Sequence, residues 1–483
     1  MSLARRTVRN TALLFTARSL SKVLVFATVI VTQNALGATG YGKFAAIVVF
    51  SNIASIFADL GLQVVFVREA SRRLDDLGAF LGTTLAAKVP LGALSGVILA
   101  VSVWLLAPDL LPLVGPVFAL LVATSVANLL RSTFYATGEM RYEVVAIAGE
   151  TVVLLVATVL AAVFKQGVAA FVWAYAASYA FTAVYAAVIT QRRYTRLRLV
   201  WNSALLRKLL RSGLPFALAF VLSTIYFRID VVILKSLRGD AQVAYYNAAY
   251  KFLDGLSFIP QAAMSAVFPA LAVIHLRGRD PMRDAYTRAY RLLAALGMPV
   301  AVACVILAPQ IIHITHVPFE QSIPALRILG ASLLLIFVNN SFIFALGAMD
   351  KQLTFALLAG LSIVVNVTLN LVMIPRFAFA DGYLAASWAT LITEVFLFVA
   401  GYIALARYLG RMPWLRPAIP IALSGAVVAA VSYALRNHHV AIVVAVAAVV
   451  YVATLAITGG VSRSEWRLAR ESLRLRRGGA PAP

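Results

Sequence analysis

Long apolar runs, separated by short polar joints, recur along almost the whole of the 483-residue chain. A helix needs about 20 mostly apolar residues to cross the hydrocarbon core of a bilayer. Many of the runs reach this length, and Pro and Gly residues mark the joints between them. Overall, 62% of the residues are hydrophobic and 13% are charged, whereas a soluble domain is roughly half apolar and a quarter charged. The chain is therefore expected to be an all-α polytopic membrane protein.

We predict about fourteen transmembrane helices from these runs. The expected ranges are 11–33, 43–65, 80–106, 111–136, 143–163, 168–190, 212–236, 243–270, 290–312, 322–346, 352–374, 383–406, 414–435 and 439–458. The first run follows three arginines but is interrupted by Arg18 and Lys22, and no small-residue cleavage site ends it. It is therefore expected to be the first helix rather than a cleaved signal.

The distribution of basic residues predicts the orientation, because Lys and Arg collect on the cytoplasmic side of membrane proteins. With the N-terminus inside, 30 of the 42 Lys and Arg residues fall in inner segments and 6 in outer segments. This bias favours an even number of helices, with both termini in the cytoplasm and the protein in the inner (plasma) membrane. The net charge of +23 does not indicate a nucleic-acid partner, because the basic residues lie between apolar spans.

An internal repeat is indicated by two pairs of matching segments. Residues 135–140, YATGEM, resemble 344–349, FALGAM, at an offset of 209. Residues 167–170, GVAA, followed by Trp173, resemble 382–385, GYLA, followed by Trp388, at an offset of 215 between the tryptophans. The pattern predicts two six-helix lobes related by a pseudo-two-fold axis along the membrane normal, with a substrate path between them. The expected division is an N-terminal lobe, a basic cytoplasmic linker, a C-terminal lobe, two extra transmembrane helices and a basic cytoplasmic tail, at residues 1–190, 191–211, 212–410, 411–460 and 461–483.

Several motifs carry a family resemblance by their order and spacing. They are NALGATGYG at 34–42, FADLGLQVVFVRE at 57–69, GLPFALAFVLSTIYFRIDVVIL at 213–234, YYNAAY at 245–250, and Asn366 and Asn370 followed by Ile374-Pro375. Over roughly residues 5–460 the chain resembles the polysaccharide transporter (O-antigen flippase) family of the multidrug/oligosaccharidyl-lipid/polysaccharide (MOP) exporter superfamily. Without this resemblance, the hydropathy and charge pattern of the sequence support only a transporter.

The resemblance implies a function and its partners. It implies a flippase that moves a polyprenyl-diphosphate-linked oligosaccharide from the inner to the outer leaflet by alternating access, for cell-surface polysaccharide and lipopolysaccharide synthesis. It also implies membrane lipids as partners, with polysaccharide polymerase or assembly proteins as further candidates. A multidrug or lipid II exporter of the same superfamily remains an alternative. A membrane oligosaccharide polymerase or ligase is a second alternative, although the outer loops are too short for a catalytic domain. A purely structural scaffold is a third.

Charges within the predicted spans are the candidate site residues, since a charged side chain at the bilayer centre costs about 2.5–3.5 kcal/mol on insertion scales. A diphosphate needs several cations when it is desolvated. The candidate substrate-binding residues are Arg18, Lys22, Lys88, Arg228 and Lys251. We expect Lys22 near the bilayer centre and Arg18 paired with Asp59. Snorkelling or structural pairing is the alternative for each of them.

Acidic residues in the spans are candidates for ion coupling or charge pairing: Asp59, Asp230, Asp254 and Glu394. Lys251 and Asp254 are expected on one helical face. Buried amides could line a polar path or bond between helices: Asn339, Asn340, Asn366 and Asn370.

No cofactor, metal or enzymatic activity is expected. His313 and His316 have only Glu320 as a third candidate ligand, the single cysteine lies in an apolar run, and no phosphate-binding loop is found. An ion gradient, the membrane potential or downstream synthesis would therefore have to drive transport.

Overall fold

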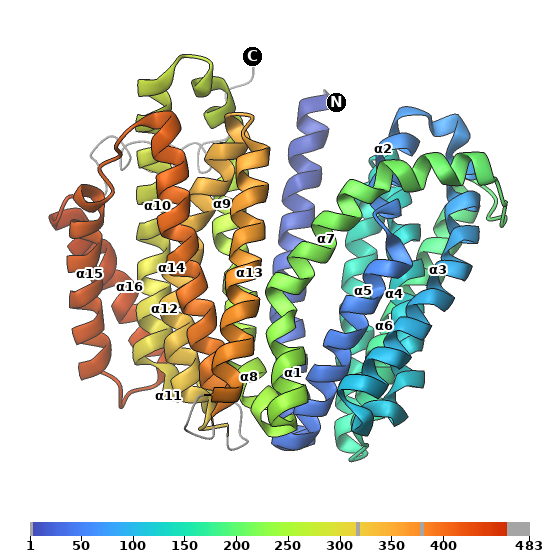
Figure 1. Cartoon of the computed structure of the whole chain (residues 1–483), viewed down its shortest axis with the longest axis horizontal. Helices are drawn as coiled ribbons and strands as arrows, with labels where there is room; N and C mark the ends of the chain where they lie inside the picture. Colours follow the sequence, from blue (N-terminus) through green and yellow to red (C-terminus); the bar gives the residue numbers. More distant parts are fainter. Residues whose placement is uncertain (1–2, 315–318, 377–380, 461–483) are drawn as a thin grey trace. The chain divides into compact units, whose positions relative to one another are not determined.

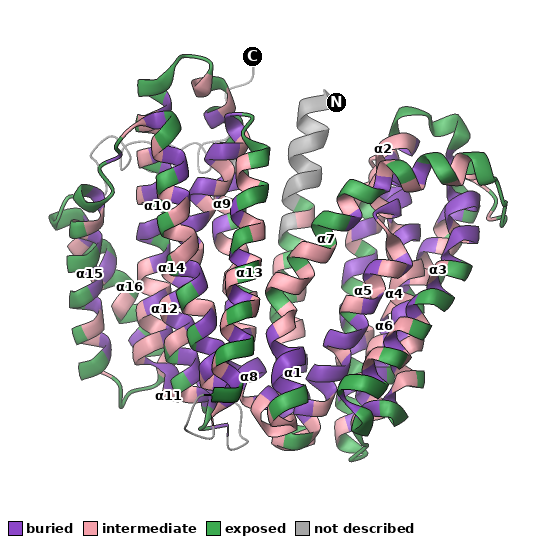
Figure 2. Cartoon of the chain, in the orientation of Figure 1, coloured by how far each residue is buried: buried purple, intermediate pink, exposed green. Residues whose placement is uncertain are grey.

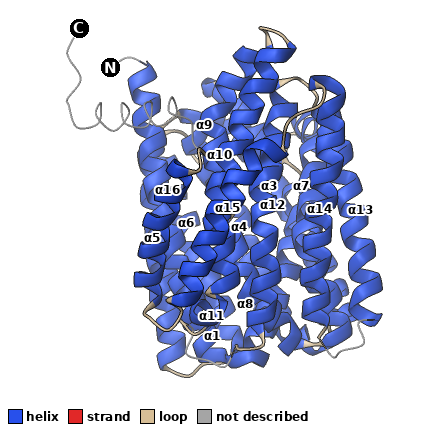
Figure 3. Ribbon diagram, turned by 90° about the vertical axis from the view of Figure 1, so that its left-hand side faces the viewer, coloured by secondary structure: helices blue, strands red, loops and turns tan. Residues whose placement is uncertain are grey.

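A computed structural model describes residues 3–314, 319–376 and 381–460, and within them it contains helices and connecting segments only (Figures 1 and 3). The elements are α1 (Leu3–Asp59), α2 (Leu62–Arg72), η1 (Leu74–Asp76), α3 (Leu77–Leu106), η2 (Pro108–Leu113), α4 (Val114–Thr137), α5 (Met140–Val163), α6 (Val168–Arg193), α7 (Ser203–Arg238), α8 (Asp240–Leu256), α9 (Phe258–His275), α10 (Arg279–Ile306), α11 (Ala308–Ile312), α12 (Ser322–Ala348), α13 (Gln352–Arg376), α14 (Gly382–Leu409), α15 (Leu415–Ala434) and α16 (Val440–Ile457).

The helices confirm the prediction of an all-α polytopic membrane protein. Twelve helices of the described residues are long and apolar enough to cross a bilayer, and the segment from Asp240 to His275, bent by 43°, is a thirteenth candidate. One of the twelve, the stretch Thr16–Asp59, has 44 residues, about twice the length of a span. It is interrupted at Gly37, whose φ of 65° is not helical. The predicted count of about fourteen is reached when the two halves of α1 are counted separately.

A backbone break divides one predicted helix. Helix α1 ends at Asp59, and Leu60 and Gly61 both adopt positive φ before α2 starts, so the range 43–65 is not one continuous helix. At Gly61 a β-carbon would lie 2.4 Å from the carbonyl oxygen of Gly213 in α7. Only glycine allows this left-handed conformation together with so close an approach of two backbones.

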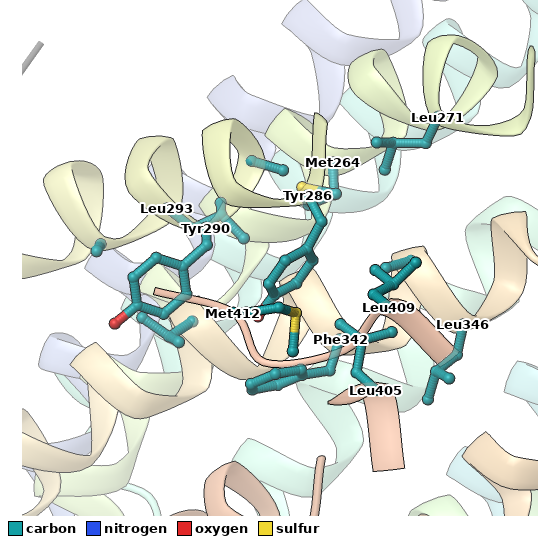
Figure 4. Packing of buried hydrophobic residues seen from close by; sticks show 14 of the residues in the cluster. Met264, Leu271, Tyr286, Tyr290, Leu293, Phe342, Leu346, Leu405, Leu409 and Met412 are labelled. Carbon is teal, nitrogen blue, oxygen red and sulfur yellow. The ribbon is translucent and has the colours of Figure 1, made fainter. Parts of the chain in front are cut away.

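The chain divides into two compact units with separate cores. The first consists of residues 1–247, 315–319 and 367–386, and the second of 248–314, 320–366 and 387–483. In the second unit, α9, α10, α12 and α14 contribute to a core whose labelled members include Tyr286, Phe342 and Leu405 (Figure 4). The core of the first unit includes Phe66, Leu81 and Phe134. The predicted lobes and their repeat stay a prediction.

Many residues on the outer helix faces are exposed (Figure 2), and large apolar residues are among them. Val97, Trp104, Val163 and Leu361 are each more than half exposed. Surfaces of this kind suit hydrocarbon rather than water, as the sequence predicted.

The predicted linker 191–211 is only partly a separate segment. Helix α6 extends to Arg193, residues 194–202 are not helical, and Ser203 already begins α7, with Asn202 accepting a hydrogen bond from the Leu205 amide as its N-cap. Leu209 is buried against the core of the first unit. The first turns of α7 are thus anchored on protein. The predicted basic tail, 461–483, lies outside the described residues.

Candidate functional site

A buried arginine with two carboxylates forms a charged cluster in the first unit. Arg131 of α4 donates from Nη2 to Glu143 Oε1 at 2.6 Å and from Nε to Glu143 Oε2 at 3.0 Å, a two-point contact on α5. A third donor, Arg131 Nη1, bonds to Glu150 Oε2 at 3.0 Å. Glu150 lies about two helical turns after Glu143 on α5. The Glu143 side chain is 0% exposed and that of Arg131 is 15% exposed. Buried charges of this kind persist only when they are paired and hydrogen-bonded.

Three further side chains extend this cluster to α1 and α6. The Tyr135 hydroxyl donates to Glu143 Oε1 at 2.8 Å and accepts a bond from Arg18 Nη2 at 2.7 Å. Thr182 of α6 donates to Glu150 Oε2 at 2.9 Å. We call the six residues the arginine–carboxylate network: Arg18, Arg131, Tyr135, Glu143, Glu150 and Thr182. It joins α1, α4, α5 and α6 through polar contacts within the membrane-spanning region.

The sequence reasoning missed most of this network. Arg131 lies within the predicted span 111–136 but was not among the candidate site residues, and the structure places it in α4, about 9 Å from the end of that helix. A signal was present, because Arg131 and Tyr135 are four residues apart and Glu143 and Glu150 seven apart. Each pair therefore lies on one helical face. Only the packing of α4 against α5 shows that the two faces meet.

Asp59 pairs with Lys88, whereas the sequence analysis predicted a pair with Arg18. Lys88 Nζ lies 2.5 Å from Asp59 Oδ1 and also donates to the carbonyl oxygen of Ala58 at 3.2 Å. The end of α1 before the break at Leu60 brings Asp59 beside α3, while Arg18 is held by Tyr135. Lys88 is therefore a buried, paired cation, and its candidate role in substrate binding would require this pair to open.

Lys22 and Arg18 both lie in the first half of α1. The first half of α1 continues to Leu36, before the break at Gly37, so Lys22 lies about 21 Å and Arg18 about 27 Å from that break. Both side chains are exposed on the first unit. The position of Lys22 near the bilayer centre stays a prediction. Ser21, between them, bonds to Thr151 of α5 at 2.6 Å and fixes the rotation of α1.

The remaining candidates lie in separate pairs. Lys251 Nζ is 3.9 Å from Asp254 Oδ2, consistent with the shared face that their spacing predicted. Asp230 is buried and accepts a hydrogen bond from the Tyr246 hydroxyl, while Arg228, on the same helix, is half-buried.

Glu394 is buried in the second unit beside an amide. Asn339 Nδ2 donates to Glu394 Oε2 at 2.8 Å and to the Glu394 carbonyl oxygen at 3.1 Å. The exposed fractions of the two residues are 4% and 2%. Asn366 Nδ2 reaches Thr393 Oγ1 at 3.4 Å on the same stretch of α14. These amides bond between helices, one of the two roles that the sequence left open.

A lysine at the end of the predicted span 212–236 is also buried. Lys235 near the end of α7 lies 2.7 Å from Asp109 of η2 and 2.6 Å from Asp240 of α8. Lys43 is 3.9 Å from the same Asp109 oxygen. This ion-pair cluster links the end of α7 to η2 and to the start of α8.

No group of three or more metal-ligating His, Cys, Asp or Glu side chains occurs among the residues that the structure describes. His313 Nε2 lies 3.5 Å from Glu320, and both side chains are exposed. His316 lies outside the described residues.

The family follows from comparison with known proteins. The model of the polysaccharide biosynthesis protein family matches residues 7–275, more than half of the chain. The chain belongs to this family. A second model, MatE, matches residues 215–372. Both matches confirm the membership of the MOP exporter superfamily that the sequence motifs indicated. No curated protein matches the chain by sequence.

Solved transporters share the fold of this family member. The lipid II flippase MurJ, in an inward closed conformation, superposes with a TM-score of 0.70 over 93% of this chain and 98% of its own, at 13% identity. An inward-facing multidrug resistance MATE transporter of the MOP superfamily gives 0.64 over 80% of this chain and 95% of its own, at 16% identity. The MATE multidrug transporter DinF-BH gives 0.55 over 85% and 97%, at 14% identity. The chain thus has the fold of flippases and exporters.

Proposed function

We propose that this protein flips a polyprenyl-diphosphate-linked oligosaccharide from the inner to the outer leaflet of the inner membrane, with both termini in the cytoplasm. The observation that carries the proposal is Arg18: an exposed guanidinium on a membrane-spanning helix, in a member of the polysaccharide biosynthesis protein family. A charge within a transmembrane helix is costly in hydrocarbon, so such charges usually face a water-filled cavity or a partner and mark substrate or ion pathways.

The substrate's diphosphate is proposed to bind at Arg18 and Lys22. The two residues are four apart and therefore lie on one face of α1, at similar depth. A compact anion with several acceptor oxygens would satisfy both cations, and an arginine can offer it two parallel donors. Lys251, on α8 of the second unit, stays a separate candidate for substrate binding.

The arginine–carboxylate network supports a link between binding and helix movement. Arg18 donates to Tyr135, and Tyr135 donates to the buried Glu143. A diphosphate that draws Arg18 away would remove one cation from a cluster that holds two carboxylates. The change in charge would favour the uptake of a proton or another cation, with Glu150 as the more exposed acceptor. Coupling to an ion gradient is therefore proposed to act through this network or through Glu394.

Deletion of the gene is the direct test. The lipid-linked intermediate should accumulate on the inner leaflet, and its chemical identity would distinguish an oligosaccharide diphospholipid from lipid II. If no lipid-linked saccharide accumulates and a drug is retained instead, the multidrug alternative is correct.

Variants of the purified protein in vesicles then test the site. Lys22→Ala should abolish flipping while the protein inserts normally, and Lys22→Arg should retain part of it. Lys165→Ala, in an exposed loop after α5, is the matched control and should flip at the wild-type rate. Wild-type flipping by Lys22→Ala at normal protein levels would refute the site. Failure of the variant to accumulate would identify Lys22 as a structural residue.

Reporter fusions test the orientation. Fusions after residue 200 and after Pro483 should both report the cytoplasm. A periplasmic reading at either position would overturn the assignment of inside and outside.

A further inference from the structure

The second unit contains a crevice between α9 and α10 that is separate from every candidate residue above. Its volume is about 710 Å³, within the range of roughly 300–1,000 Å³ typical of ligand pockets. The two helices are joined by a tight turn in which Gly278 has φ 111°. Ala285, Ala289 and Ala295 line the α10 side. These small side chains explain why the helices leave a space where larger residues would have filled it.

One wall of the crevice is apolar. From α9 come Val267, Ala270, Leu271 and Ile274, and from α10 comes Leu292. Flanking residues continue the apolar surface outward: Val273 is 56%, Leu276 84% and Leu296 37% exposed. The core-facing residues of α10, Tyr286, Tyr290 and Leu293, point instead into the packed cluster (Figure 4). A surface that is apolar inside and at its flanks suits a hydrocarbon chain from the membrane.

The crevice is lined by charged side chains from the α9–α10 turn along α10 to Arg291. Its lining includes Arg277, Arg288 and Arg291 together with Asp280 and Asp284, which leaves one net positive charge. Asp280 is already paired, at 3.2 Å, with Arg283, which does not line the crevice.

Arg288 and Arg277 are the two exposed cations of the lining. Arg288 lies further along α10, next to the apolar wall. It forms no ion pair with any residue in the part of the chain that the structure describes. Arg291, three residues later, shares its side of α10.

We propose that this crevice binds an anionic phospholipid of the inner leaflet, with an acyl chain along the apolar wall and the phosphate at Arg288 and Arg291. Basic pockets between transmembrane helices on the cytoplasmic side are a known setting for anionic headgroups. A singly charged headgroup such as that of phosphatidylglycerol matches the one net positive charge of the lining. The two aspartates disfavour the higher charge of a polyprenyl diphosphate. The proposed orientation places the α9–α10 turn on the cytoplasmic side.

Native mass spectrometry of the full-length protein tests the proposal. Protein from micelles containing equal phosphatidylglycerol and phosphatidylcholine should retain phosphatidylglycerol preferentially. Arg288→Ala should weaken this retention about tenfold, as expected for a lost charge-assisted contact. Ala285→Leu should also weaken it, because the added side chain occupies the crevice. Arg407→Ala removes an exposed arginine of α14 outside the crevice and should retain the lipid as the wild type does.

Three results would overturn the proposal. The first is equal retention of the two phospholipids by the wild type. The second is an equal loss in Arg288→Ala and Arg407→Ala, which would indicate general surface charge. The third is displacement of phosphatidylglycerol by undecaprenyl diphosphate at lower concentration, with Arg288→Ala abolishing that displacement, which would assign the crevice to the transported substrate. None of these results bears on the flipping assay with Lys22 variants.

Discussion

Removal of Arg131 should be among the most destabilising single substitutions in the first unit. Arg131→Leu leaves Glu143, whose side chain is 0% exposed, without its two-point partner, and removes the contact to Glu150. Loss of one partner of a buried ion pair typically costs about 3–5 kcal/mol, because the other charge stays buried and uncompensated. The remaining donor to Glu143 is Tyr135, whose hydroxyl supplies one bond at 2.8 Å. A single neutral donor replaces little of what the guanidinium provided.

A double-mutant cycle can separate the cost of the lost hydrogen bonds from the cost of the uncompensated Glu143 charge. Interhelical hydrogen bonds within membranes average only about 0.6 kcal/mol in such cycles, so the bonds alone predict a small effect. The uncompensated charge of Glu143 predicts a large one. Glu143→Leu in the Arg131→Leu background removes this charge and should restore part of the stability. The double variant is therefore expected to be more stable than Arg131→Leu alone, with a coupling energy of about 2 kcal/mol or more.

Reversible unfolding of the reconstituted protein, followed through the first unit, is the appropriate assay. Tyr135→Phe serves as a mild reference, because it removes one donor to Glu143 at a cost of about 1 kcal/mol. Arg131→Leu with wild-type stability, or strictly additive effects of Arg131→Leu and Glu143→Leu, would refute the reasoning. Either outcome would mean that water or protonation already compensates Glu143.

Further predictions concern the helix break and the buried acid of the second unit. Gly61→Ala should destabilise the protein by about 2 kcal/mol or more in the same unfolding assay, since a left-handed alanine costs about 1–2 kcal/mol and its β-carbon meets Gly213. Gly138→Ala has a similar φ but open space around its β-carbon, so it should show the conformational cost alone. Glu394→Gln keeps an acceptor for Asn339 and should unfold like the wild type. If Glu394 couples transport to an ion gradient, substrate flipping by Glu394→Gln in vesicles should no longer depend on that gradient. An unchanged dependence would exclude this role.

The positions of the candidate residues along the chain were readable from the sequence, but most of their partners were not. Lys251 and Asp254 were expected to share a face because they are three residues apart, and the structure brings them within 3.9 Å. Asp59 was expected to meet Arg18 because their depths seemed equal, yet Lys88 is its partner. Depth along separate helices says nothing about which helices are neighbours.

The sequence by itself determined that the chain is a bundle of membrane-spanning helices, because the need to bury apolar length in hydrocarbon acts on each run separately. The predicted spans 11–33 and 43–65 leave Gly37 in the joint between them, but the break at Gly61 falls inside a predicted span and accompanies a close contact with α7. Only the tertiary structure decided that Arg131 is buried. An arginine six residues from a helix end could equally reach water, and what holds it inside is a pair of carboxylates on another helix. Burial of a charge depends on its partner, and the partner is selected by packing.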